Sequence, residues 1–206
     1  MISAVVLAAG RSTRMGRNKL ILPLDGKPVL QRVLDALRDS KVDEIVVVLG
    51  AGADEVRSKV ALEGTKVVTN GRYADGMSAS IKAGLAGVHR STSAAIIVLG
   101  DQPFLSASLV DGLVDAFQAE GAPVVVPVHL GKRGNPVLFA RRVFPEIMKI
   151  SGDHGAKPVV RAHGGDVFEV DVKDARGAVD VDTPADYEQA SLLSRQVRRR
   201  RTRGRA

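Results

Sequence analysis

Residues that could bind phosphate lie close together near the start of the chain. The stretch LAAGRSTRMGRNK, residues 7–19, follows an apolar run and contains two glycines and four cations: Arg11, Arg14, Arg17 and Lys19. Glycines let backbone N–H groups approach an anion and the cations supply positive charge, so this pattern favours a polyphosphate ligand. Without other evidence, a surface loop with an ordinary basic face explains the stretch better than a phosphate-binding loop does.

Two well-known phosphate-binding motifs do not match this stretch. The GxxxxGK[ST] pattern is absent because Lys19 does not follow Gly16, and GxGxxG is absent because Gly10 is followed by Arg-Ser. The sequence therefore supports neither a Walker-type ATPase nor a standard dinucleotide-binding fold.

Two acidic residues could bind a metal ion beside this loop. Asp101 comes one glycine after the apolar run 94–99, and Asp182 stands directly before Thr183. Two carboxylates combined with phosphate oxygens are a donor set that Mg²⁺ prefers. A turn-forming acid at Asp101 and a capping residue at Asp182 explain the sequence equally well, and Asp180 competes with Asp182 for the metal.

Several other chemistries are excluded by what the chain lacks. It has no cysteine, which rules out disulfides, thiolate metal sites and a cysteine nucleophile. There is no Ser-His-Asp arrangement, and the four histidines (89, 129, 154 and 163) lack metal-ligand spacing and are expected at the surface. Nucleotidyl transfer remains open, because it depends on positioning and charge neutralisation and needs no protein nucleophile.

The elements that would position these groups alternate along the chain. Apolar runs predict buried strands at 3–7, 44–49, 66–69, 94–99 and 123–126, with further strands at 136–139 and 167–170. Helical patterns lie between them, at 28–37, 53–61, 78–88, 106–119, 141–150 and 156–162. Thr183 and Pro184 begin a final helix with an acid, Asp186, three residues after the cap. This order predicts an α/β fold with a doubly wound, mostly parallel sheet flanked by helices.

The length of 206 residues fits one domain, at 1–194, and the distribution of charge predicts a basic, disordered tail at 195–206. The tail holds seven Arg and no acidic residue. The rest of the chain has 23 basic residues, the other part of the 30 in total, and 23 acidic residues, so it carries no net charge. RNA or an anionic surface is the alternative partner of the tail, although 3% aromatic residues leave few platforms for stacking bases. The apolar start lacks a basic n-region and no apolar stretch approaches membrane-spanning length, so we expect a cytoplasmic protein without membrane association.

The loop and five later segments together resemble the MobA-like nucleotidyltransferase family. The family's opening pattern is matched by Leu7-Ala8-Ala9-Gly10, Ser12, Arg14-Met15-Gly16 and Lys19. The later segments follow in the family's order: NGRYADGMSASIKAGL (70–85), LGDQPFL (99–105), RGNPVLF (133–139), GDHGAKPVV (152–160) and DVDTPADY (180–187). The resemblance covers nearly all of residues 1–190 and implies a Rossmann-like nucleotidyltransferase fold.

The resemblance also implies an activity. It is closest to the molybdenum cofactor cytidylyltransferases, which transfer CMP from CTP to the terminal phosphate of the molybdopterin cofactor and release pyrophosphate. Ala9 favours CTP, since relatives that transfer GMP tend to carry LAGG. Guanylyl transfer, a sugar-phosphate acceptor and, from another class, an NAD(P)-dependent oxidoreductase on the same scaffold remain alternatives. A molybdoenzyme or its chaperone would be the protein partner.

The resemblance assigns roles to individual residues. Asp101 and Asp182 match the aspartates that bind Mg²⁺, and Arg14, Lys19 and Asp101 are the catalytic candidates. The nucleotide-binding candidates are Leu7, Ala8, Ala9, Gly10, Arg14, Lys19, Asn70, Gly76, Ser78 and Ser80. Ser78 is equally well explained as a helix cap. Asn135 and Asp153 are the candidates for acceptor binding, where Asn70 is a further candidate, and Asp153 could instead form a turn.

Overall fold

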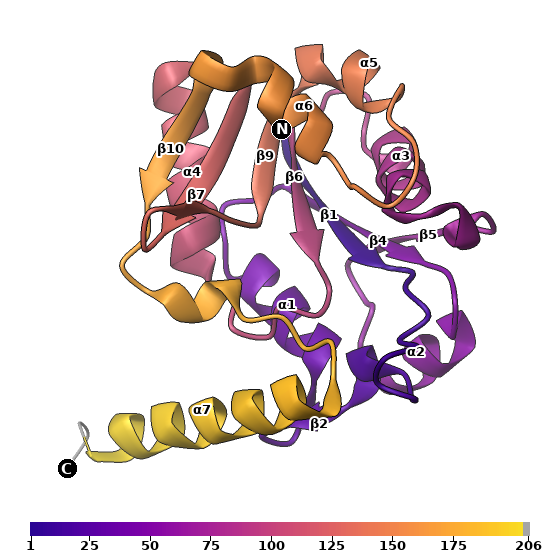
Figure 1. The fold of residues 1–206 in the computed structure, drawn as a ribbon, viewed down its shortest axis with the longest axis vertical. Helices are drawn as coiled ribbons and strands as arrows, with labels where there is room; N and C mark the ends of the chain where they lie inside the picture. Colours follow the sequence, from indigo (N-terminus) through magenta and orange to yellow (C-terminus); the bar gives the residue numbers. More distant parts are fainter. Residues whose placement is uncertain (204–206) are drawn as a thin grey trace.

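An eight-stranded sheet forms the centre of the protein. The computed structural model describes residues 1–203, with side chains for 1–174 and 176–196. The strands of the sheet are β1 (Ile2–Ala8), β4 (Glu44–Leu49), β5 (Lys66–Thr69), β6 (Ala94–Leu99), β7 (Val124–His129), β8 (Lys132–Arg133), β9 (Val137–Ala140) and β10 (Val167–Asp171). Their order is β10-β7-β9-β6-β1-β4-β5, with β8 paired to β7 (Figure 1).

Most neighbouring strands in this sheet are parallel, which confirms the predicted fold class. Strand β9 is the exception among the long strands, because it pairs antiparallel to both β6 and β7. The chain reverses through the short β8 and returns directly beside β7, and so short a connection cannot join parallel strands. A small separate hairpin, β2 (Pro23–Leu24) and β3 (Lys27–Pro28), was not expected from the sequence.

Seven α-helices accompany the sheet in the described part of the chain. They are α1 (Val29–Arg38), α2 (Ala53–Lys59), α3 (Met77–Gly87), α4 (Ala107–Glu120), α5 (Phe144–Ile147), α6 (Lys157–His163) and α7 (Pro184–Arg203). The predicted helix at 141–150 is shorter, because a 3₁₀ turn, η3 (Arg141–Val143), precedes α5. Four further 3₁₀ turns are η1 (Lys19–Ile21), η2 (Tyr73–Asp75), η4 (Gly164–Asp166) and η5 (Ala175–Ala178).

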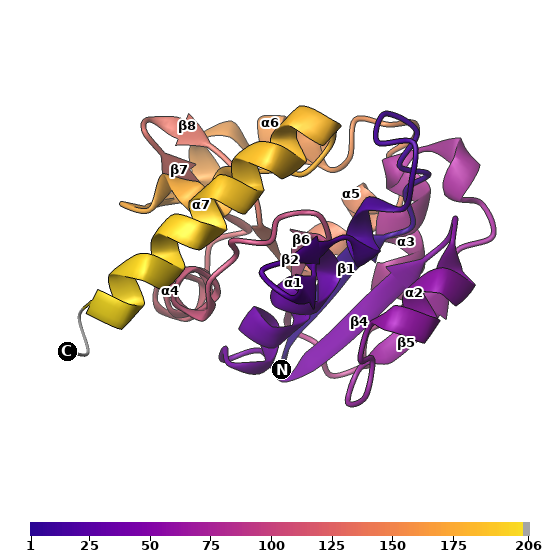
Figure 2. The same cartoon turned by 90° about the horizontal axis from the view of Figure 1, so that it is seen from below.

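The two faces of the sheet are covered by different helices, as Figures 1 and 2 show from two directions. On one face the apolar stripe of α1 packs with α4 against side chains such as Ala4 and Val6. On the other face α3, α5 and α6 pack against Val5 and its neighbours. Successive residues of a strand point to opposite faces, so a continuous apolar run fills both cores.

The carboxyl ends of β1 and β6 lie side by side, because Leu7 pairs with Leu99 in parallel register. The loops that follow these strands therefore leave the sheet at the same edge. Gly100 lets them approach closely, since a Cβ there would lie 2.9 Å from the carbonyl oxygen of Leu7. This brings Asp101 to the loop at 9–18, called the β1 loop below.

The last helix begins as the sequence predicts. Thr183 and Asp186 form a capping box, in which the backbone N–H of Thr183 donates to Asp186 (2.8 Å) and that of Asp186 donates to the Thr183 hydroxyl (3.3 Å). Helix α7 then continues to Arg203, so it includes most of the segment predicted as a disordered tail; residues 204–206 lie outside the described residues. In residues 1–203 every helix is too short or too polar to cross a membrane.

Candidate active site

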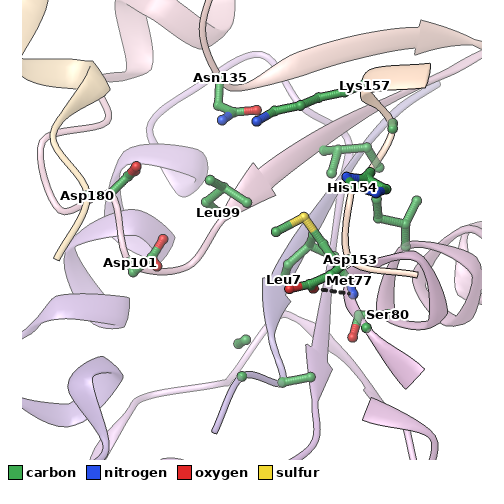
Figure 3. A pocket seen from close by; sticks show the side chains of 18 of the residues that line it. Leu7, Met77, Ser80, Leu99, Asp101, Asn135, Asp153, His154, Lys157 and Asp180 are labelled. Carbon is green, nitrogen blue, oxygen red and sulfur yellow. Dashed lines mark hydrogen bonds between the residues drawn. The ribbon is translucent and has the colours of Figure 1, made fainter. Parts of the chain in front are cut away.

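A cleft of about 1060 Å³ opens where β1 and β6 end (Figure 3). It brings together twelve of the fourteen predicted site residues: Leu7, Ala8, Ala9, Gly10, Arg14, Lys19, Gly76, Ser80, Asp101, Asn135, Asp153 and Asp182. The two others, Asn70 and Ser78, are buried and do not line it. The cleft thus combines segments from all parts of the chain.

The β1 loop is held in a tight turn that points Lys19 into the cleft. The carbonyl of Ser12 accepts from the backbone N–H groups of Met15 (3.1 Å) and Gly16 (3.2 Å), and its hydroxyl accepts from the N–H of Lys19 (3.2 Å). Gly16 has a φ of +72°, a conformation that glycine adopts without strain. These hydrogen bonds fix the shape of the turn. The start of the loop lines the cleft.

Two carboxylates converge on the ammonium group of Lys19. Its Nζ donates to Asp101 and to Asp182, the latter at 2.6 Å, and only 13% of the Lys19 side chain is exposed. Burial alone would lower the pKa of Lys19, but the two carboxylates outweigh it and raise the pKa above its usual value. Lys19 is therefore a permanent cation between two anions.

The segment 180–182 is placed by one buried residue, Val181. Its side chain is fully buried, and its backbone N–H donates to the carbonyl of Asp101 at 3.0 Å. Successive side chains of an extended segment point to opposite sides. Because Val181 points into the core, its neighbours Asp180 and Asp182 point to the cleft, which both of them line. Asp182 also accepts from Arg14 at 3.0 Å. The capping of α7 involves Thr183 and Asp186, so the carboxylate of Asp182 is free to face the cleft.

Asp180 is the third acid of this cluster, and we refer to Asp101, Asp180 and Asp182 as the acidic centre. Burial, followed by repulsion from Asp101, raises the pKa of Asp180, while a hydrogen bond from the side-chain amide of Gln102 (2.6 Å) opposes the shift. Gln102 is 2% exposed and its Oε1 has no hydrogen-bond partner within the described residues. Asp180 is thus held beside the predicted metal ligands by a buried amide.

The donor set of the acidic centre suits a divalent cation. Asp101 and Asp182 already share one cation, the Lys19 ammonium, which shows that both can reach a common positive charge. Across the described residues no group of three or more acidic, histidine or cysteine side chains is arranged as a complete metal site. Magnesium commonly takes one or two carboxylates and completes its coordination with phosphate and water, so two protein ligands fit it.

The segment before α3 forms the opposite side of the cleft from the acidic centre (Figure 3). Gly76 and Ser80 line the cleft, whereas Ser78 is 3% exposed and gives its backbone N–H to the carbonyl of Gly152. Asn70 is 6% exposed and donates to the hydroxyl of Ser80 at 3.1 Å. In this structure Asn70 therefore orients Ser80 from behind, and Ser78 is not the cap of α3.

Asp153 contacts the start of α3 instead of standing free in the cleft. Its carboxylate accepts from the backbone N–H of Met77 at 3.0 Å, drawn as a dashed line in Figure 3. The contact needs a glycine at position 76, whose φ is +97° and whose Cβ would lie 2.6 Å from the carbonyl carbon of Gly152. The loop at 152–156 is thereby fastened to α3.

Several residues that line the cleft were not predicted for it. They are Tyr73, Met77, Arg133, His154, Lys157 and Arg161, and Arg11 stacks over the Tyr73 ring with 5.5 Å from guanidinium to ring centre. The motif at 152–160 was recognised in the sequence, but the helical period alone did not indicate which of its residues face a ligand. The available signal was the spacing of Lys157 and Arg161, two cations four residues apart in a short predicted helix.

The expectation that the histidines lie at the surface is wrong for His129. This residue is 6% exposed, and neither ring nitrogen has a hydrogen-bond partner in the described part of the chain. It ends the buried strand β7, and the turn before β9 packs on its ring: a Cβ at Gly134 would lie 2.9 Å from His129 Cδ2. Gly134 is only five residues further on, but the sequence does not show that the chain turns back over the ring.

Comparison with known proteins finds relatives that match most of the chain. A nicotine blue oxidoreductase of Paenarthrobacter nicotinovorans is 30% identical over 88% of this chain and 92% of its own. The molybdenum cofactor cytidylyltransferase of Escherichia coli K12 is 26% identical over 90% of this chain and 93% of its own. The structure of Rv0371c of Mycobacterium tuberculosis H37Rv, in complex with manganese, has a TM-score of 0.82 and 33% identity, covering 93% of this chain and 98% of that one.

The family itself is established by a match over most of the chain. Residues 4–167 match the MobA-like NTP transferase domain, and this span includes most of β1, the β1 loop, Asp101 and α6. The protein is therefore a member of the MobA-like nucleotidyltransferase family.

Proposed function

We propose that this protein transfers CMP from CTP to a phosphorylated acceptor, the molybdopterin cofactor, and releases pyrophosphate. The observation that carries the proposal is the convergence of Asp101 and Asp182 on the Lys19 ammonium at the end of the β1 loop. The similarity to a molybdenum cofactor cytidylyltransferase, together with Ala9 in the opening motif, favours this nucleotide and this acceptor.

The β1 loop holds the triphosphate in this proposal. Backbone N–H groups of Ala9 and Gly10 approach the phosphates, while Arg14 and Lys19 neutralise their charge. Both cations are already next to the acidic centre, at 3.0 Å and 2.6 Å from Asp182. Binding the phosphates therefore exchanges carboxylate partners for phosphate oxygens without a large movement of the loop.

Mg²⁺ is the proposed cofactor, held by Asp101 and Asp182, and when bound it would neutralise charge at the α-phosphate and at the incoming phosphate. A terminal phosphate oxygen of the acceptor then attacks the α-phosphorus of CTP. The bond from that phosphorus to the bridging oxygen breaks, and the oxygen leaves as part of pyrophosphate. Gly76 and Ser80 lie on the wall where the ribose and base would bind, supported by Asn70.

The acceptor lies in the other half of the cleft, between Asn135 and the loop that contains Asp153. Asp153 acts there by holding this loop against α3, since its carboxylate is bonded to the Met77 backbone. Its predicted role in acceptor binding is thus one of positioning. The protein works in the cytoplasm, and a molybdoenzyme or its chaperone would receive the product.

Pyrophosphate release tests the proposal directly. The protein is incubated with Mg²⁺, each of the four nucleoside triphosphates, and either molybdopterin cofactor or a sugar 1-phosphate. We expect release only with CTP and the molybdopterin cofactor. Release with GTP would replace cytidylyl by guanylyl transfer, release with the sugar phosphate would replace the acceptor, and no release under any combination would overturn the proposal.

An oxidoreductase function is the second candidate, favoured by the 30% identity with nicotine blue oxidoreductase. Hydride transfer has no need for two carboxylates that share a cation, so it leaves the pairing of Asp101 and Asp182 without a role. Tight binding of NADPH in the presence of EDTA would support this alternative. Nucleotide binding that requires Mg²⁺ and prefers CTP would exclude it.

A further inference from the structure

Charges around the cleft are compensated unevenly. Every acid that lines it has a partner: Asp75 pairs with Arg72, Asp101 with Lys19, Asp153 with the Met77 N–H, Asp180 with Gln102, and Asp182 with Lys19 and Arg14. Among the cations, Arg11 stacks on Tyr73, Arg14 and Lys19 are paired as above, and Arg133 is paired with Glu169 at 2.6 Å. Within the described residues, Lys157 and Arg161 have no such partner and still line the cleft.

These two cations share one face of α6. They are four residues apart, which places them one above the other on a helix, and both are exposed. The opposite side of α6 is anchored by Val159, which is 5% exposed in the core beneath the sheet. The helix is therefore fixed with its unpaired charges toward the opening of the cleft.

A polar side chain from another element completes the arrangement. In Figure 3 the side chain of Lys157 extends toward Asn135. Both lie at some distance from the carboxylates of Asp101 and Asp180. Asn135 lies in the turn before β9 and also lines the cleft. We refer to Asn135, Lys157 and Arg161 as the α6 wall. An ammonium, a guanidinium and an amide together are a donor set suited to a phosphate or another oxyanion.

We propose that the α6 wall is a second anion site, which binds an anionic group of the acceptor while the triphosphate occupies the β1 loop. The proposal rests on the proposed nucleotidyl transfer. The triphosphate already has Arg14, Lys19 and the backbone of the β1 loop as partners, and Figure 1 shows α6 and that loop at different ends of the sheet's face. The unpaired cations are thus available to the acceptor, which a second site would hold in line for attack.

Inorganic phosphate is the probe that tests this site. The full-length protein is saturated with Mg²⁺ and α,β-methylene-CTP, which fills the β1 loop and cannot transfer CMP, and phosphate binding is then titrated by calorimetry at low ionic strength. The test variant is Lys157→Ala with Arg161→Ala. The control is Lys149→Ala with Arg90→Ala, two exposed cations that do not line the cleft. Thermal unfolding confirms that all three proteins are folded.

The outcomes separate the two proposals. We expect phosphate to bind the loaded wild type and the control equally, and the test variant about tenfold more weakly, with the CTP analogue bound equally by all three. Equal phosphate binding by test and control variants, or no phosphate binding to the loaded wild type, overturns the second anion site alone. A wild type that does not bind the CTP analogue overturns the proposed function, and the second site with it.

Discussion

The acidic centre and the α6 wall face the same cleft but differ in how their charges are satisfied. In the acidic centre, Asp101 and Asp182 share the ammonium of Lys19, and Asp182 also pairs with Arg14. On the α6 wall, Lys157 and Arg161 have no ion-pair partner among the described residues.

The two regions therefore suit different ligands. Carboxylates that converge on one cation have the arrangement that the proposed Mg²⁺ needs, and in the proposed function the Lys19 ammonium moves to a phosphate when the metal binds. Cations without a partner are organised for an anion that the protein does not itself supply.

Replacing Asp101 by Asn should affect catalysis most. The amide keeps the size of the side chain and removes its negative charge, so the fold is retained while cation binding is lost. We expect kcat for pyrophosphate release to fall by about 10²–10³-fold, because the metal ion that this carboxylate would help to hold would no longer neutralise charge in the transition state. Asp115→Asn, which changes an exposed acid paired with Lys41, is the control and should leave kcat unchanged. Wild-type activity in Asp101→Asn would remove the role assigned to this residue.

Replacing Lys19 by Met should reveal the cation site through stability. Without its ammonium, Asp101 and Asp182 repel each other, and in EDTA we expect a loss of about 1–3 kcal/mol in the free energy of unfolding, reduced from the value for fully buried pairs by partial exposure. Added Mn²⁺ should raise the melting temperature of this variant more than that of the wild type. Lys27→Met, which removes an exposed lysine paired with the half-buried Asp35, is the control. An equal effect of Mn²⁺ on all three proteins would contradict the shared site.

Replacing Gly76 by Ala should disturb the contact between α3 and the loop that leads to α6. The new Cβ would lie 2.6 Å from the carbonyl carbon of Gly152, at a φ of +97°. We expect a loss of about 1–3 kcal/mol in the free energy of unfolding, measured with urea. Gly71→Ala has no atom within 4 Å of the new Cβ and should be nearly neutral. If both variants had equal stability, this close approach would not matter.

Replacing Asp180 by Asn should stabilise the metal-free protein at neutral pH. Burial and Asp101 raise the pKa of Asp180 in the folded state, so its contribution to stability is complete below the unfolded pKa and is lost as the pH rises through the folded one. The variant should lack this decline and melt slightly higher at pH 7 in EDTA, by about 1–2 °C, because Asp180 is partly exposed and solvent screens its charge. If the melting temperatures of the two proteins changed in parallel from pH 4 to 8, the charge of Asp180 would not destabilise the folded state.

The elements of the fold were predictable where a local pattern decides them. Helix α1 was predicted because Val29, Leu30 and Val33 begin a stripe that repeats with the helical period, and all three are fully buried. The antiparallel direction of β9 was not predictable. It depends on which strands β9 pairs with, and the four residues of β9 do not indicate this.

The acidic centre was predictable in part, because Asp101 follows a recognisable strand and Asp182 directly precedes a recognisable helix cap. The behaviour of Asn70 and Ser78 was not, since a polar residue can bond inward or face a ligand, and packing against Ser80 and Gly152 decides between them. The absence of an ion-pair partner for Lys157 among the described residues was also not predictable, because it depends on which acidic side chains the fold brings near it.

A crystal structure with CTP and Mn²⁺, in which anomalous scattering locates the metal, would show whether the two aspartates form a cation site. We expect one strong peak bound by the carboxylates of Asp101 and Asp182, with the ammonium of Lys19 on a phosphate oxygen of the nucleotide. A metal bound elsewhere while Lys19 still joins the two aspartates would rule out this site.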